Sequence, residues 1–260
     1  MHAEFTFQLA TLYGFMLALA RVSGVIVFVP IPGFSAGPDA SRVVLALALT
    51  FALFPAWPAL AVQDTPTLAV GRLVGSIAEE TLLGVTVGLA VSFLLEGVQM
   101  AAQSLGLQAG YSYASTVDPT TQADSTTLQV MAQLLAGMLF FAFGFDRQVI
   151  KALARSFQST SGAAFTLDGQ AIEAIVRLGA SIFTTGLQLA IPVLALLVLL
   201  DIAFAVLGRL HAQLQLLSLS FAIKMLTGLV FLAGVLSVYP EVFERSGAIT
   251  FAVLDRVLSR

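Results

Sequence analysis

The chain contains no cysteine, and only 10% of its 260 residues are charged. Without cysteine it forms no disulfide, holds no metal through a thiolate and has no cysteine nucleophile. Its twelve Lys and Arg residues are scattered and its formal net charge is -3, so it lacks the basic footprint of a nucleic-acid-binding protein. Nucleic-acid partners are therefore excluded.

Residue patterns that support catalysis are also missing. The two histidines, His2 and His211, do not form the i, i+4 pair that grips zinc on a helix. No Gly-x-Ser-x-Gly nucleophile elbow is present. Asp118 and Asp124 are six residues apart across a proline, a spacing that does not hold two carboxylates together for acid and base work. We therefore predict that the chain is not an enzyme and uses no cofactor or metal.

What the chain has instead is apolar length. Hydrophobic residues make up 58% of the sequence and the mean hydropathy is +0.95, which indicates an integral membrane protein. The length suffices for about six spans of roughly 20 residues, so we predict a single membrane domain over residues 1–260. The fold class predicted is all-α and polytopic, with some segments broken or hairpin-like. The apolar runs are residues 9–30, 43–62, 73–102, 127–145, 175–207 and 214–239.

Prolines and charges refine this organisation. The sequence VPIPGFSAGP (residues 29–38) neither continues a helix nor pairs in a sheet, so the first helix ends there. Pro192 lies inside an apolar run and is expected to kink its helix rather than end it. The distribution of Lys and Arg between the loops predicts that both termini are cytoplasmic.

The C-terminal tail, about residues 241–260, has the pattern of an amphipathic helix. Phe251, Leu254 and Leu258 share one face, and Asp255 and Arg256 lie off it. Two interpretations stay open: the apolar face covers the membrane surface or a partner, or the tail is a solvated terminal helix.

Between Gln103 and Gln129 the apolar pattern is interrupted by a polar stretch without Lys or Arg. It is rich in Gly, Ser, Thr and Gln, and Asp118 before Pro119 is typical of a turn. Backbone groups of such a stretch would have no hydrogen-bond partners in lipid. The stretch must therefore be wrapped in protein, line a water-filled space or lie outside the membrane.

Charged side chains inside apolar runs are functional candidates, because burying them in a membrane is costly. A transporter would use them to couple an ion, whereas an assembly would use them as ion pairs between subunits, which we favour. Small residues support an assembly, since the GxxxG spacings Gly84–Gly88 and Gly106–Gly110 allow close backbone approach. The candidate charges are Arg21, Glu79, Glu80, Glu96, Asp201 and Lys224.

Four segments carry a resemblance to a known family: the first helix with Arg21, ending in VPIPGF; SRVVLALALTFALFPAWP; the stretch EGVQMAAQSLGLQAGYSYASTVDPTTQADSTTLQVMAQLL; and LQLAIPVLALLVLLDIAF. The chain resembles the FliR family of flagellar export proteins, whose counterpart in virulence type III secretion is the SctT family. The most specific part is GLQAGYSYASTVDP, which is similar to the family's GLQMGFSxAxxxDP block. Two positions depart: Gly144-Phe145-Asp146 replaces the usual Asn-Gly-His turn, and Ser220 and Ala222 replace a Gly and a Pro.

The resemblance implies a subunit of the type III export gate, which carries unfolded flagellar proteins across the bacterial inner membrane at the flagellar basal body. The resemblance implies FliP-like and FliQ-like proteins as partners in one helical channel complex, and the large FlhB-like and FlhA-like export-gate proteins as further partners. The resemblance also implies that the polar stretch, from Gly106 to about Ala123 in this chain, is a plug in the closed pore. The plug residues implied are Gly106, Gly110, Tyr111, Tyr113, Asp118 and Pro119.

A secondary transporter is the alternative. In it the polar stretch would be a re-entrant substrate site, and Glu96, Asp201 or Lys224 would couple an ion. That architecture expects two inverted halves with matching broken helices, whereas the polar interruption in this chain has no twin.

Overall fold

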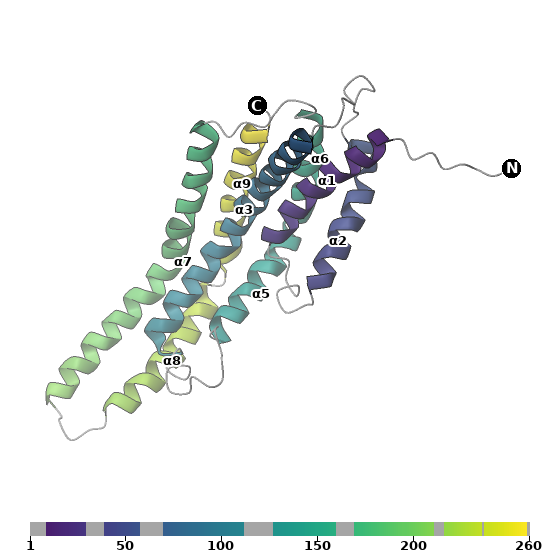
Figure 1. Cartoon of the computed structure of the whole chain (residues 1–260). Helices are drawn as coiled ribbons and strands as arrows, with labels where there is room; N and C mark the ends of the chain where they lie inside the picture. Colours follow the sequence, from purple (N-terminus) through teal and green to yellow (C-terminus); the bar gives the residue numbers. More distant parts are fainter. Residues whose placement is uncertain are drawn as a thin grey trace. The chain divides into compact units, whose positions relative to one another are not determined.

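The computed structural model describes residues 9–29, 39–57, 70–111, 127–159, 169–210, 216–235 and 237–258, and within these ranges all regular structure is helical (Figure 1). This confirms the all-α polytopic class. The helices are α1 (Leu9–Phe28), α2 (Asp39–Ala52), the 3-10 turn η1 (Phe54–Ala56), α3 (Val70–Ala109), α5 (Thr127–Ala142), α6 (Phe145–Ser159), α7 (Gly169–Leu210), α8 (Leu216–Val235) and α9 (Tyr239–Leu258).

Each of the six apolar runs contains a helix, but fewer than six are long enough to cross a membrane. Over the described ranges three helices qualify, and a fourth span arises if α5 and α6 form one bent unit. Shorter apolar helices, α2 and α8 among them, account for the remaining runs, so the prediction of about six apolar helical segments, some of them broken, is confirmed. Hydropathy does not show where a helix ends. In the described part of the second run, α2 ends at Ala52, shortly before Pro55, and the short η1 follows.

Helix boundaries agree with the sequence at the prolines and differ at the polar stretch. α1 ends at Phe28, next to the Pro-rich segment, and α7 continues through Pro192, both as predicted. α3 was expected to stop at residue 102, yet it continues to Ala109. The residues of this extension, QSLGLQA, are polar only in part and all are compatible with a helix.

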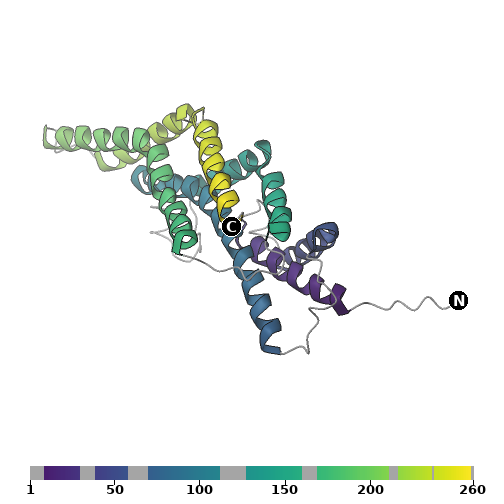
Figure 2. The same cartoon turned by 90° about the horizontal axis from the view of Figure 1, so that it is seen from above.

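The chain forms two compact units, each described here by itself. Unit 1 contains residues 1–92, 144–179 and 249–260, and unit 2 contains residues 93–143 and 180–248. α1 and α2 of unit 1 lie side by side in both views (Figures 1 and 2). The single membrane domain expected from the sequence stays a prediction.

In unit 1, the end of α9 packs against the chain itself. Leu254 is 1% exposed, Leu258 is also buried, and the ring of Phe251 lies 5.3 Å from the ring of Phe145 at the start of α6. Phe251 on the apolar face of the tail thus contacts α6 of the same unit, and cover of this helix by a membrane surface or a partner stays a prediction. Amphipathicity shows that one face must be covered, but not by what.

In unit 2, α3 and α7 approach closely at two glycines. A Cβ atom built on Gly186 would lie 3.0 Å from the carbonyl oxygen of Gly97, and one on Gly97 would lie 3.2 Å from Cβ of Thr185. The two backbones can come this near only because side chains are missing there. The sequence offers no warning of this contact, since the two glycines are far apart and neither belongs to a GxxxG pair.

Candidate functional site

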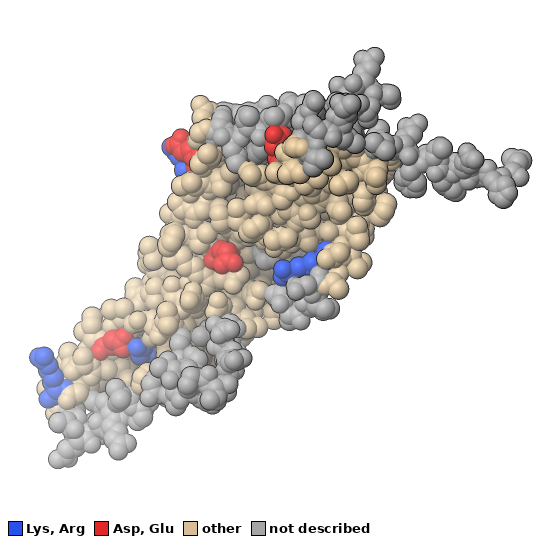
Figure 3. All heavy atoms as spheres, in the orientation of Figure 1, with Lys and Arg blue, Asp and Glu red and all other residues tan. Residues whose placement is uncertain are grey.

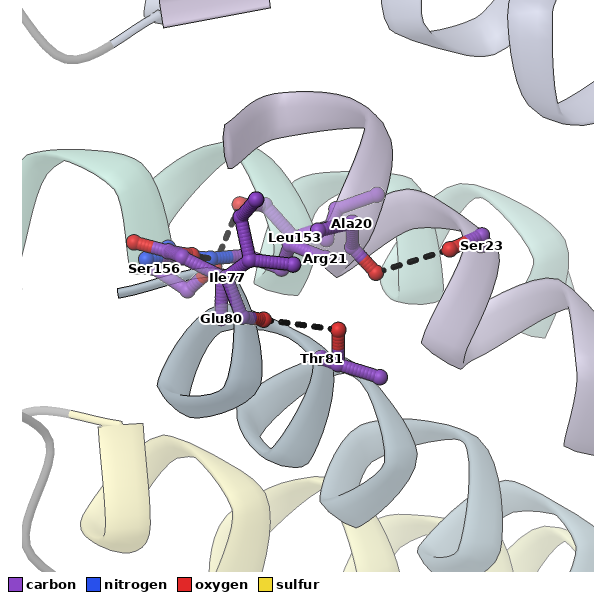
Figure 4. Close-up of polar contacts among 8 residues, drawn as sticks. All are labelled: Ala20, Arg21, Ser23, Ile77, Glu80, Thr81, Leu153 and Ser156. Atoms are coloured by element: carbon purple, nitrogen blue, oxygen red, sulfur yellow. Dashed lines mark hydrogen bonds and ion pairs between the residues drawn. The ribbon is translucent and has the colours of Figure 1, made fainter. Parts of the chain in front are cut away.

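Charged residues are few in the chain, and on the face drawn in Figure 3 they form small patches among the other residues. Buried charges are therefore informative. Arg21 of α1 is 1% exposed, and its Nε donates a hydrogen bond to Oε2 of Glu80 on α3. Its Nη1 donates to Oγ of Ser156 on α6 at 2.9 Å (Figure 4), and its guanidinium carbon lies 4.3 Å from the ring centroid of Phe157. One guanidinium thus joins three helices of unit 1.

The backbones of α1 and α3 touch beside this arginine. A Cβ atom on Gly84 would lie 2.0 Å from the carbonyl oxygen of Arg21, and one on Gly88 would lie 2.8 Å from that of Val25. On the other helix, a Cβ atom on Gly24 would lie 2.6 Å from the carbonyl oxygen of Thr81. Gly84 and Gly88, singled out as a packing pair, therefore sit at a helix crossing within the chain. Gly24 was missed, because a single glycine inside a helix forms no motif.

A second polar cluster lies in unit 2. Asp201 on α7 accepts hydrogen bonds from two other helices: Lys224 of α8 lies 2.8 Å from its Oδ1, and Nε2 of Gln108 on α3 lies 2.9 Å from its Oδ2. The side chain of Lys224 is 12% exposed, against 44% for Asp201. Sequence reasoning named Asp201 and Lys224 but missed Gln108, whose only signal was its place in the polar stretch.

These contacts place two of the candidate ion pairs within the chain, and ion pairs between subunits stay a prediction. Arg21 pairs with Glu80, and Lys224 pairs with Asp201, all within the chain. Glu96 differs: it is exposed on α3, and in the described ranges no Lys or Arg forms an ion pair with it.

The start of the polar segment is fixed to α8 in unit 2. Gly110 ends α3 with a φ of +90°, a left-handed conformation that suits glycine, and the amide of Tyr111 donates to the carbonyl of Gly106 at 2.9 Å. The hydroxyl of Tyr111 donates to the carbonyl oxygen of Met225 at 2.8 Å. A Cβ atom on Gly110 would meet the ring of Phe221 at 3.0 Å. The segment that continues from here is thus held at its first two residues.

Gly106 lies inside helix α3, not in a loop, and is buried. Tyr113, Asp118 and Pro119 lie outside the described residues. The structure thus brings Gly106, Gly110 and Tyr111 together at the end of α3 and leaves the rest of the expected plug undescribed.

The two clusters offer no arrangement for catalysis in the part of the chain that can be seen. Each carboxylate of the clusters is engaged by a cation, and no three His, Asp or Glu residues there gather as metal ligands. Each cluster joins helices that are distant in sequence through hydrogen bonds and ion pairs, which indicates a structural role.

Residues 12–248 match the family model described as bacterial export proteins, family 1. The chain belongs to this family. It is 28% identical over 241 residues to the flagellar biosynthetic protein FliR of Escherichia coli K12, covering 93% of this chain and 91% of that protein. It is 29% identical to FliR of Pectobacterium carotovorum, with 88% and 87% covered, and 24% identical to FliR of Bacillus subtilis, with 94% of each covered.

The match confirms the resemblance found in the sequence segments. Membership in a family of export proteins also confirms that the chain is a membrane component of an export apparatus and not an enzyme. The family match holds despite the departures at Gly144, Ser220 and Ala222. The chain breaks between α5 and α6 at Gly144, whose φ is +66°.

Proposed function

We propose that the chain is a core subunit of the flagellar type III export gate in the bacterial inner membrane, at the flagellar basal body. The observation that carries this proposal is the match along nearly the whole length of both chains to proteins named FliR from three bacteria. The gate conducts unfolded flagellar proteins, and this chain supplies part of its wall.

The partners proposed are FliP-like and FliQ-like subunits in the same channel, with FlhB-like and FlhA-like proteins beside it. Support comes from the exposed apolar side chains of unit 2, which include Phe183, Leu187 and Ile191 along α7. Such a face needs an apolar cover, which lipid or the helices of other subunits can supply. In a channel complex, neighbouring helices fill that role.

Within this gate, the segment from Gly106 to about Ala123 acts as the plug of the closed pore. Support comes from its polar, nearly uncharged composition and from the fixed start at Gly110 and Tyr111. A segment with few apolar contacts loses little when it moves, so it can close an aqueous pore and still give way to a polypeptide.

The test of the gate assignment is the native mass of the tagged chain, gently extracted from its own membranes, with identification of every co-purifying polypeptide. We expect one copy of the chain among several FliP-like and FliQ-like subunits. A monomer or homodimer without partners would overturn the assignment and favour the secondary transporter with a re-entrant substrate site.

Deletion of residues 112–124 tests the plug. This deletion keeps Gly110 and Tyr111, so the end of α3 retains its contacts with α8. We expect membranes that contain the assembled complex to leak ions or small solutes, measured as conductance or as loss of a trapped dye. The control shortens the connection between α6 and α7 at residues 160–166, and membranes that contain this variant should not leak. Unchanged conductance in an assembled deletion variant would refute the plug.

A further inference from the structure

The exposed face of α3 in unit 2 is polar from Glu96 to Gln103 and becomes apolar at Leu107, which is 63% exposed. Glu96 and Gln103 are exposed and Gln99 is half-buried, and their spacing of three and four residues places them on one helix face. Nε2 of Gln99 lies 3.5 Å from Oε1 of Glu96. The other side of the same helix segment is apolar and buried; it consists of Leu94, Leu95, Val98, Ala101, Ala102 and Leu105.

Helix α5 of the same unit provides a comparison. Its exposed residues are all apolar. A face of that kind suits lipid or the apolar surface of a neighbouring subunit. The face of α3 from Glu96 to Gln103 differs from it, because its exposed side chains are polar, although both faces belong to apolar helices. The exposed α5 residues are Val130, Met131, Leu134, Met138, Phe141 and Ala142.

Lipid does not suit the polar face of α3. Glu96 lies within the span Leu73–Ala109, about 20 Å along the helix from Ala109 at 1.5 Å per residue. A charged side chain at the centre of a span costs about 2.5–3.5 kcal/mol on insertion scales. The amide groups of Gln99 and Gln103 add further hydrogen-bonding groups that lipid leaves unsatisfied.

We propose that the face formed by Glu96, Gln99 and Gln103 lines the water-filled conduit of the gate and contacts the unfolded polypeptide in transit. The inference rests on the proposed function. The face lies on the same helix as Gly110, where the polar segment begins, and the exposed Leu107 stands between the two. A glutamine amide both donates and accepts hydrogen bonds, which matches the backbone amides of an extended chain of any sequence.

A cation from a neighbouring subunit is the competing explanation. Such a cation would form an ion pair with Glu96, but it does not explain why the amide of Gln103 is exposed on the same face. Water in a conduit accounts for all three side chains. The two explanations also differ in what reaches Gln103: bulk solvent in one case and a protein surface in the other.

The absence of cysteine gives a direct test. Gln99→Cys and Gln103→Cys each introduce the chain's only thiol, and Met138→Cys on the apolar face of α5 is the matched control. The assembled complex, in membranes opened to both sides, is treated with a membrane-impermeant thiol reagent, and modification is followed on the tagged chain. Thiols react as thiolates, which need water, so we expect both α3 variants to react roughly tenfold or more faster than the control.

Slow modification at both positions, equal to that of Met138→Cys, would overturn the proposal. Slow modification together with loss of the complex in Glu96→Gln would establish the cation of a partner instead. Each variant is also scored for co-purifying subunits and for secretion of flagellar protein. A chain that still assembles and exports but does not react refutes the conduit face alone, whereas a chain that never assembles with gate subunits refutes the proposed function.

Discussion

Arg21 places a positive charge in the interior of unit 1, and its contacts determine what a substitution there does. Removing one partner of a buried ion pair leaves the other charge uncompensated, which typically costs about 3–5 kcal/mol. Arg21→Met leaves the carboxylate of Glu80 without its ion-pair partner. It also removes the hydrogen-bond donor to Ser156 and the contact with the ring of Phe157. We expect a clear drop in the thermal unfolding midpoint of the protein purified in detergent.

Two further variants separate charge from packing at this site. Arg21→Met combined with Glu80→Leu replaces the pair by apolar residues, and such replacements are often close to neutral. The double variant should therefore unfold nearer to wild type than Arg21→Met alone. Arg177→Ala is the matched control, because the side chain of Arg177 is 79% exposed in its pair with Glu173 and such pairs contribute about 0–1 kcal/mol. An unchanged midpoint in Arg21→Met would refute a supporting role for Arg21.

At the scale of elements, the crossing of α1 and α3 depends on the absence of side chains. Gly84→Ala puts a Cβ atom 2.0 Å from the backbone oxygen of Arg21, so the helices must separate, and overpacking of this kind costs about 1–3 kcal/mol. Gly75→Ala on the same helix meets nothing within 4 Å and should gain about 0.5–1 kcal/mol from helix propensity. Thermal midpoints of the two purified variants should therefore move in opposite directions. Equal shifts would show that α1 and α3 do not touch at Gly84.

Part of this element structure could be predicted, and particular residues show where prediction stops. The Pro-rich segment correctly predicted where α1 ends, and the Gly84–Gly88 spacing correctly indicated that another helix backbone approaches closely there. The length of α3 could not be read from its polarity. Glutamine is a good helix former, so the polarity of Gln108 did not mark the end of the helix. Its hydrogen bond to Asp201, 93 residues away in sequence, could not be predicted from the local pattern.

At the scale of the whole molecule, two helices are longer than a membrane requires. α3 has 40 residues and α7 has 42, so each is roughly 60 Å long, against a hydrocarbon core of about 30 Å. Composition predicted a membrane protein but not helices longer than the membrane is thick. Apolar surface that faces lipid and apolar surface that faces protein have the same hydropathy, so the sequence does not distinguish them. Helices of this length with apolar surface along much of them favour an environment made largely of other subunits.

The chain without its partners should therefore be short-lived. Expressed alone, it exposes the apolar side chains of α7 and the polar face at Glu96 to whatever surrounds it, and local opening makes it a substrate for membrane proteases. We expect its half-life in a pulse-chase experiment to be several-fold shorter than when FliP-like and FliQ-like subunits are co-expressed. Co-expression with an unrelated polytopic membrane protein is the control and should not protect it. Equal half-lives in all three cases would mean that the chain is self-sufficient in lipid, so its long helices would need an explanation other than assembly.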